Sequence, residues 1–428
     1  MINTHKQKEK VVLVCYINKK EKSIIPLKET LDELSFLAET AGAKVVKTFF
    51  QEKDSFDSRF VIGKGKVDEI SIYTEANDIS LVIFENELGY TQLRNLEQKI
   101  KCKILDKSNL ILDIFAQNAR TAQAKLQVEL AQLEYLLPRL TRQWTHLSKQ
   151  YGGIGTKGPG ETQIETDRRL INTRISVLKN KLKTIVQQRK TQSEERKKYI
   201  RLALVGYTNA GKSTLLNMLT DSDVYVENKL FATLDTSTRA LNLSRAGKNL
   251  ESRFPKKVLI SDTVGFIRNL PHNLIESFKS TLSEVVESDF LLHVIDVSNT
   301  NFEEQISVVN DTLEEIGADN KKIIHIFNKV DKLNDKDLLK EIRRKYSHSV
   351  AISASKGINL NSLIETLRNE ISENNIERII RLKPDNYKGL NQVYKLADVK
   401  EVKYLKTSIK IKLETNEKNI LQLEKLSK

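Results

Sequence analysis

The segment YIRLALVGYTNAGKSTLLNML, from Tyr199 to Leu219, limits what this chain can fold into more than any other. It reads as a buried strand, then a GxxxxGKS loop, then an amphipathic helix. Glycines let such a loop bend around phosphates, its backbone N–H groups point inward, and the helix N-terminus adds its dipole. Lys212 would reach the β and γ phosphates, and the Ser213 hydroxyl would bind Mg²⁺. The segment predicts an α/β domain that holds a nucleoside triphosphate.

Three further motifs follow this loop, and each begins where an apolar strand ends. The strand VLISD leads into DTVG, where Asp262 can hold a Mg²⁺-bound water and the Gly265 N–H can meet the γ-phosphate. The strand KKIIHIF leads into NKVD, and VAI leads into SAS. Ligands of open α/β sheets bind at the ends of the strands, so we expect the four loops to converge on one site.

Asp331 in the NKVD motif predicts that the base is guanine. Its carboxylate can accept hydrogen bonds from guanine N1–H and the exocyclic amine. Adenine lacks both donors, so a buried carboxylate would be left unpaired, which gives ~10³-fold discrimination or better. We expect Asn328 to brace the loops, the aliphatic part of Lys329 to cover the base, and the Ala354 N–H to meet guanine O6. The order and spacing of the motifs predict a GTPase domain.

The first switch segment must lie between the phosphate loop and DTVG, and LFATLDTSTR is the candidate. Thr233 is the favoured second Mg²⁺ ligand and γ-phosphate contact, with Thr236 and Thr238 as alternatives. Ordering of this segment by the γ-phosphate would make the switch. The predicted GTP-binding set is Gly206, Tyr207, Thr208, Asn209, Ala210, Gly211, Lys212, Ser213, Thr214, Phe231, Ala232, Thr233, Leu234, Asp235, Asp262, Thr263, Val264, Gly265, Asn328, Lys329, Val330, Asp331, Ser353, Ala354 and Ser355.

Phe266 stands directly after DTVG, where many small GTPases carry a Gln that orients the attacking water. Its side chain cannot hydrogen-bond to water, so we expect slow hydrolysis by the isolated domain and activation by a partner or an ion. Asn209 in the phosphate loop either recruits potassium as a substitute for an arginine finger or is a turn residue. The predicted catalytic residues are Lys212, Thr233, Gly265 and Asn209.

Four regions follow one another along the 428 residues. We predict a small α/β domain with a mostly parallel sheet in residues 1–115 and a long helical hairpin in 116–198. The GTPase domain occupies 199–373, and a small α+β domain occupies 374–428. In the last region we predict strands at Val399–Tyr404 and Ser408–Leu413.

Apolar residues spaced three and four positions apart predict the hairpin. They are Leu126, Leu130, Leu133, Leu137, Leu140, Trp144 and Leu147 in the first helix and Ile171, Ile175, Leu178, Leu182 and Ile185 in the second. The Gly and Pro residues of YGGIGTKGPGET cannot continue a helix, so we expect an antiparallel pair with a glycine-rich tip at 150–162. Pro138 should kink the first helix.

The formal charge of +14 suits a polyanionic partner, although a lysine-rich composition would produce it equally well. Two cysteines, Cys15 and Cys102, are too few for a disulfide framework or zinc site, so we expect core thiols in a reducing compartment. No apolar run approaches the ~20 residues of a membrane helix. The charged N-terminus and the short apolar run after it read as a first strand, not a secretory signal. These features favour a cytoplasmic protein.

Long strings of this sequence resemble the HflX-type GTPases of the Obg–HflX-like branch. They are VIGKGKVDEI, NELGYTQLRNLEQKI, ILDIFAQNARTAQAKLQVELAQLEYLLPRL, GGIGTKGPGETQIETDRR, GYTNAGKSTLLN, LFATLDTSTR and DTVGFIRNLP. The resemblance covers nearly the whole chain, and the last fifty residues match loosely. Thr236 stands where the family pattern has Pro, which bears on the first switch alone.

The resemblance implies a GTPase that binds the large ribosomal subunit and its rRNA and splits or rescues stalled ribosomes under stress. It implies that the N-terminal domain and hairpin reach into the peptidyl-transferase region. We expect a monomer in the cytoplasm, partly ribosome-associated or peripheral at the membrane, without stable membrane insertion and without DNA binding. The implied cofactors are GTP and Mg²⁺, with K⁺ as a further candidate. The alternatives are a GTPase of ribosome assembly or RNA modification, and a GTP-switched RNA-binding adaptor with little turnover.

Basic residues near the hairpin tip fit such an RNA partner. Glycines there let the backbone approach ribose and phosphate closely, and RNA is commonly read through shape, 2′-hydroxyl and stacking contacts. Trp144 either packs in the seam or stacks on a base. The Gly63–Lys66 run GKGK is either a phosphate contact or a turn. The RNA-binding candidates are Arg139, Arg142, Lys149, Tyr151, Lys157, Arg168 and Arg169.

Overall fold

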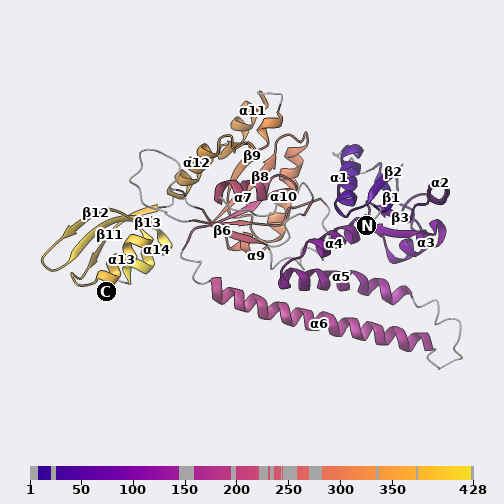
Figure 1. The fold of residues 1–428 in the computed structure, drawn as a ribbon, viewed down its shortest axis with the longest axis horizontal. Coiled ribbons are helices and arrows are strands. Elements are labelled where there is room, and N and C mark those ends of the chain that lie inside the picture. The colour runs from indigo at the N-terminus through magenta and orange to yellow at the C-terminus, as the bar shows by residue number, and fades with distance from the viewer. Residues whose placement is uncertain are drawn as a thin grey trace, which may run out of the picture. The chain divides into compact units, whose positions relative to one another are not determined.

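The computed structural model describes residues 8–20, 26–143, 159–193, 199–220, 230–231, 236–241, 243, 258–268, 282–333, 337–372 and 375–425. The chain forms two compact units (Figure 1). The first comprises Met1–Ile185, Glu227–Leu234 and Asn269–Phe278, and the second comprises Val186–Val226, Asp235–Arg268 and Lys279–Lys428. The predicted domain boundaries at 115/116, 198/199 and 373/374 stay predictions.

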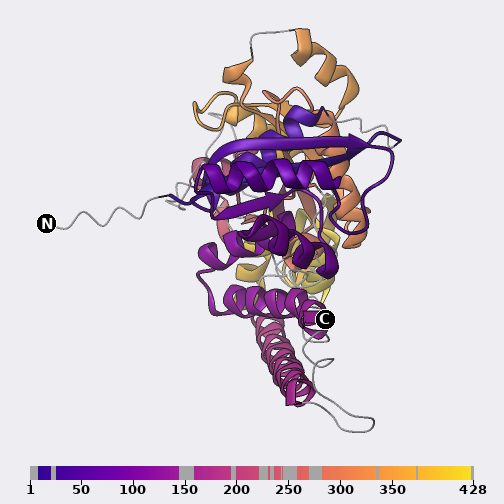
Figure 2. The ribbon, with the colours of Figure 1, turned by 90° about the vertical axis from the view of Figure 1, so that its right-hand side faces the viewer.

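A four-stranded parallel sheet organises the N-terminal part of the first unit (Figure 2, indigo). Its strands are β1 (Lys10–Asn18), β2 (Lys44–Lys53), β3 (Leu81–Phe84) and β4 (Lys103–Asp106). They lie in the order β2-β1-β3-β4, and each neighbouring pair is parallel. Val12, Val14, Val82 and Phe84 are fully buried in its core. The predicted parallel α/β domain is confirmed.

Four helices connect and cover these strands. They are α1 (Leu27–Thr40), α2 (Lys64–Ala76), α3 (Tyr90–Ile100) and α4 (Lys107–Asn118). Gly63 is the N-cap of α2, and its N–H donates to Gln51 Oε1 at 2.6 Å. The GKGK run therefore begins a helix, which corrects its interpretation as a turn. Cys15 is buried as predicted, whereas Cys102 is partly exposed.

Two long helices, α5 (Ala122–Gln143) and α6 (Pro159–Ser193), lie side by side (Figure 1). Their contact is the predicted apolar seam, in which Leu130, Ile175 and Leu178 are buried and Leu126, Leu133, Leu137, Ile171 and Leu182 are partly buried. The helix α5 continues through Pro138. Residues 159–162, predicted to belong to the tip, instead begin α6, because Pro suits the first position of a helix. The rest of the tip and Trp144 lie outside the described residues.

The GTPase region contains a six-stranded sheet in the second unit. Its strands are β5 (Arg201–Val205), β6 (Ser237–Leu241), β7 (Val258–Asp262), β8 (Phe290–Asp296), β9 (Lys322–Asn328) and β10 (Ser349–Ala351). Their order is β10-β9-β8-β5-β7-β6, and only β6 is antiparallel to its neighbour. After β5 the chain first forms β6 and β7 on one side of this strand and then β8, β9 and β10 on its other side. A ligand site is therefore expected at the carboxyl end of β5.

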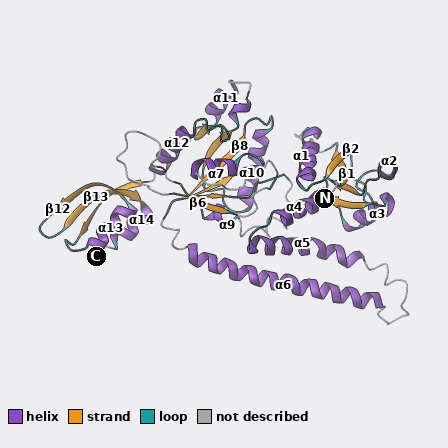
Figure 3. Cartoon of the chain, in the orientation of Figure 1, coloured by secondary structure: helices purple, strands orange, loops and turns teal. Residues whose placement is uncertain are grey.

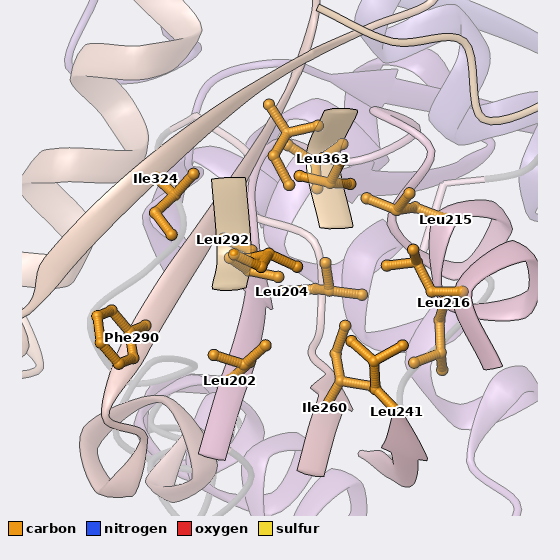
Figure 4. Packing of buried hydrophobic residues seen from close by; sticks show 14 of the residues in the cluster. Leu202, Leu204, Leu215, Leu216, Leu241, Ile260, Phe290, Leu292, Ile324 and Leu363 are labelled. Atoms are coloured by element: carbon orange, nitrogen blue, oxygen red, sulfur yellow. The ribbon is translucent and has the colours of Figure 1, made fainter. Parts of the chain in front are cut away.

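Helices cover both faces of this sheet (Figure 3). They are α7 (Lys212–Thr220), α9 (Ser283–Glu287), α10 (Phe302–Glu315), α11 (Asp337–Lys345) and α12 (Leu360–Ser372), with the 3₁₀ turn η4 at Val330–Lys332. Leu215 of α7 and Leu363 of α12 pack with Leu204 and Leu292 of the sheet, and all four are fully buried (Figure 4). On the other face Phe302 of α10 lies 6.0 Å from Phe327, ring centre to ring centre.

The C-terminal region is a three-stranded antiparallel sheet in the order β11-β13-β12. Its elements are β11 (Asn375–Leu382), α13 (Tyr387–Leu396), β12 (Asp398–Tyr404), β13 (Ile409–Asn416) and α14 (Glu417–Glu424). The prediction of strands near 399–404 and 408–413 is confirmed, but it missed β11. The charged residues within NIERIIRL, and the exposure of Ile379, obscure the alternation that marks a strand.

Among the described residues, no helix is both long enough and apolar enough to cross a membrane.

Candidate nucleotide site

Glycines shape the loop between β5 and α7. Gly206 has φ 147°, and a Cβ there would lie 2.2 Å from the carbonyl oxygen of Val294. Gly211 has φ 98°, and a Cβ there would lie 2.3 Å from Asn328 Nδ2. Any side chain would clash at these distances, and both backbone conformations disfavour residues other than glycine. The first and last glycines of GxxxxGKS are therefore required by packing as well as by phosphate access.

Lys212 is buried at the start of α7. Its Nζ donates to the carbonyl oxygens of Gly206 and Tyr207, at 3.0 and 2.8 Å. Burial lowers the pKa of Lys212 to about 8, and the carboxylate of Asp262 only partly opposes this shift. The loop thus surrounds a buried ammonium group whose positive charge Asp262 compensates only in part. A bound phosphate would supply further negative charge next to it.

Ser213 and Asp262, predicted to act at the metal, lie together. The Ser213 hydroxyl donates to Asp262 Oδ2 at 2.5 Å, and Asp262 is fully buried at the end of β7. A hydroxyl and a carboxylate are hard oxygen donors, and Mg²⁺ commonly takes one or two carboxylates together with substrate phosphates. The two residues therefore fit a Mg²⁺ ion shared with a triphosphate.

Main-chain hydrogen bonds join the phosphate loop to the loop after β7. Thr208 N donates to Phe266 O at 2.8 Å, and Phe266 N donates to Gly206 O at 3.1 Å. Gly265 lies so close that a Cβ would come 2.8 Å from Thr208 Cα and 3.0 Å from Lys212 Nζ. The DTVG glycine therefore borders the amine that is expected to hold the γ-phosphate.

Asn328 joins two loops, which confirms its predicted bracing role. Its side chain is buried, Nδ2 donates to Ala210 O at 2.8 Å, and Oδ1 accepts from Ala354 N at 2.9 Å. The Ala354 amide was predicted to meet guanine O6. In the structure it donates to Asn328 instead, so its contact with the base stays a prediction.

Lys329 crosses from the NKVD loop toward the phosphate loop. Its Nζ donates to Asn209 O at 2.8 Å and to Asp296 Oδ2 at 2.6 Å. These bonds fix the ammonium and extend the aliphatic stem that is expected to cover the base. Asp296 ends β8 and was missed by the sequence analysis. The sequence feature that could have revealed Asp296 is a carboxylate directly at the end of an apolar strand, but no recognisable motif surrounds it.

Asp331 is exposed in the turn η4. A hydrogen bond from the Ser353 side chain lowers the pKa of the Asp331 carboxyl below its ordinary value. Asp331 is therefore ionised at neutral pH and able to accept two hydrogen bonds from a purine. The burial that guanine selection requires would come from the purine itself, which would cover the carboxylate.

The remaining predicted residues divide into two sets. Thr214, Thr263, Val264, Val330 and Ser355 lie on or next to the converging loops, and the Thr263 hydroxyl donates to Leu204 O at 2.6 Å. Phe231 belongs to the first unit, where its ring meets Phe115 edge-on at 4.7 Å and its carbonyl accepts from Asn118. Its contact with GTP stays a prediction. Ala232, Thr233, Leu234 and Asp235 lie outside the described residues.

The RNA candidates also differ in their surroundings. Arg139 pairs with Asp106 at 3.3 Å, and its guanidinium lies 3.4 Å from the ring centre of Tyr135. The Arg139 guanidinium is therefore partly buried and already paired with a carboxylate and an aromatic ring of the first unit. Arg168 and Arg169 are exposed on α6. The Arg142 side chain and residues Lys149, Tyr151 and Lys157 lie outside what the structure describes.

Comparison with protein families assigns three consecutive segments. Residues 28–116 match the family described as GTP-binding GTPase N-terminal, and residues 118–196 match the GTP-binding GTPase middle region. Residues 201–329 match the family described as 50S ribosome-binding GTPase. The last segment contains the phosphate loop, DTVG and the Asn and Lys of NKVD.

Three proteins named GTPase HflX are similar over most of their length. The protein of Flavobacterium psychrophilum is 52% identical over 323 residues, 76% of each chain. That of Escherichia coli is 39% identical over 376 residues, 87% of this chain and 86% of its own. That of Magnetococcus marinus is 38% identical over 407 residues, 94% of this chain and 91% of its own. This chain therefore belongs to the HflX family of GTPases, and it binds GTP and hydrolyses it to GDP and phosphate.

Proposed function

We propose that this GTPase binds the large ribosomal subunit and uses GTP to split or rescue stalled ribosomes. The observation that carries the proposal is the match of residues 201–329 to a family described as 50S ribosome-binding GTPase. The net charge of +14 agrees with a polyanionic partner. So does the position of Arg168 and Arg169, which are exposed in the N-terminal half of α6.

The proposed metal is Mg²⁺. Ser213 would be a direct ligand, Asp262 would hold a metal-bound water, and Thr233 would complete the protein ligands when the first switch closes. The hydrogen bond between Ser213 and Asp262 supports the first two assignments. When bound, the ion would neutralise charge on the β and γ phosphates.

The test is co-sedimentation of the full chain with separated large and small ribosomal subunits. We expect retention on the large subunit with a non-hydrolysable GTP analogue, weak retention with GDP, and faster GTP hydrolysis on adding large subunits. Retention that ignores the nucleotide, together with an unchanged hydrolysis rate, would contradict the proposal. Binding only to naked or precursor rRNA would favour a role in ribosome assembly instead.

A matched pair of double variants distinguishes an RNA contact made by α6 from an effect of the total positive charge of the protein. Arg168→Gln with Arg169→Gln should weaken retention and reduce its dependence on salt, because fewer counterions are released. Lys340→Gln with Lys345→Gln removes the same charge from α11, where both lysines are exposed and paired with acidic residues. This control should bind as the unaltered chain does.

We further propose that K⁺ assists hydrolysis at Asn209. Asn209 is exposed in the phosphate loop with φ 60°, a conformation that also suits a turn residue. Hydrolysis should be several-fold faster in potassium than in sodium at equal ionic strength, because a bound cation offsets transition-state charge. Asn209→Gly keeps the backbone conformation and removes the amide, so it should abolish the difference. Equal hydrolysis rates of the unaltered chain in the two salts would contradict a role for K⁺.

A further inference from the structure

Phe266 stands where many small GTPases carry the side chain that orients the attacking water, and its ring cannot take that role. Its ring is buried, 2% exposed, and its backbone is bonded to both Gly206 and Thr208. A polar side chain at this position would point into the core rather than toward the phosphates. The orienting group therefore has to come from another residue near the γ-phosphate position.

Thr208 is the described residue that meets this requirement. Its N–H is held by Phe266 O, which places its side chain next to Gly265. A Cβ atom placed on Gly265 would lie 2.9 Å from Thr208 Cγ2 and 3.0 Å from Lys212 Nζ. The threonine methyl group, the DTVG glycine and the phosphate-binding amine thus border one small region, and the Thr208 hydroxyl is carried by the same Cβ as that methyl group.

The hydroxyl of Thr208 is unusual within this region. Thr208 is 7% exposed, and its Oγ1 is buried without a hydrogen-bond partner among the described residues. Leaving a buried hydroxyl unpaired is destabilising, so such groups normally have a partner or a functional reason. A phosphate oxygen and a water molecule are partners that a nucleotide would bring to this place.

We propose that Thr208 is a catalytic residue for GTP hydrolysis. Its hydroxyl donates a hydrogen bond to a γ-phosphate oxygen and accepts one from the attacking water. The water oxygen forms a bond to the γ-phosphorus while the bond to the bridging oxygen breaks, and its electron pair leaves with GDP. The proton of the water passes to the departing phosphate, and the hydroxyl of Thr208 is unchanged at the end.

The test compares Thr208→Val with Thr208→Ser in single-turnover hydrolysis by the protein alone, without ribosomal subunits. Valine keeps the shape and removes the hydroxyl, so the rate should fall about 10²-fold, as on losing one preorganised hydrogen bond in a transition state. Serine keeps the hydroxyl and should retain most of the rate. The affinity for GDP, which lacks the γ-phosphate, should be unchanged in both variants, and the unfolding temperature should not fall, because valine removes a buried hydroxyl that has no partner among the described residues.

Two results would overturn the proposal. One is a Thr208→Val rate equal to that of the unaltered chain. The other is an equal loss in Thr208→Ser, which would assign the effect to the packing of the methyl group. Both readouts are independent of ribosome binding, so their failure leaves the proposed partner untouched.

Discussion

Asp331→Asn should change the preferred base from guanine to xanthine. The asparagine amide donates where the carboxylate accepted, and xanthine presents a carbonyl where guanine carries its exocyclic amine. The affinity for GTP should fall about 10³-fold while XTP binds more tightly than GTP, because the mismatched pair leaves polar groups unpaired under the base. Calorimetric titration with GTP, XTP and ATP measures the change.

Asp337→Asn is the matched control for this variant. Asp337 is an exposed aspartate at the start of α11, paired with Lys340, and it has no role in the predicted base contact. It should leave the order of GTP, XTP and ATP unaltered. An Asp331→Asn protein that still prefers GTP would show that another loop selects the purine.

Lys212→Ala should abolish measurable triphosphate binding. The amine is expected to make at least two charge-assisted hydrogen bonds to phosphates, and their loss corresponds to about 10³-fold or more in affinity. The fold should survive, because burial already disfavours the charge of this amine. Fluorescence titration with a labelled GTP analogue gives the affinity, and thermal unfolding gives the stability. Tight GTP binding by a folded variant would contradict the role of Lys212.

The pH dependence of binding provides a second readout for Lys212. Its pKa is about 8 in the unliganded chain, and phosphate charge should raise it in the complex. The affinity is then fully present below pH 8 and falls as the pH rises above it, because binding must take up a proton. Lys340→Ala, in which an exposed lysine is lost from α11, should keep this profile. Constant GTP affinity from pH 7 to 9.5 in the unaltered chain would exclude a lysine that charges on binding.

The parts of the site that the sequence predicted are those whose chemistry is local. Gly206, Lys212 and Ser213 stand in one short motif, and the strand before it and the helix after it follow from apolar spacing. The convergence of DTVG and NKVD on that motif followed from the rule that ligands bind at the ends of parallel strands. Each of these inferences needed only neighbouring residues and the class of fold.

What was missed depends on contacts between residues far apart in the chain. Asp296 acquires its role because β8 lies beside β9, which brings it to Lys329. The hydroxyl of Thr208 is significant only because Phe266 is buried and Gly265 packs against it. Ser353 acts on Asp331 across 22 positions. Motif patterns contain no information on such side-chain surroundings, because tertiary packing creates them.

The main-chain hydrogen bonds between Gly206, Thr208 and Phe266 limit how far a side-chain substitution can disturb the contact between the two loops. Their donors and acceptors are peptide groups, so replacing the side chains of Thr208 or Phe266 leaves the connection in place. The Tyr207 hydroxyl extends it by accepting from Arg268 N at 3.1 Å. These hydrogen bonds tie the position of the phosphate loop to that of residues 266–268. The main-chain part of this linkage should survive side-chain substitutions that would remove a salt bridge in the same place.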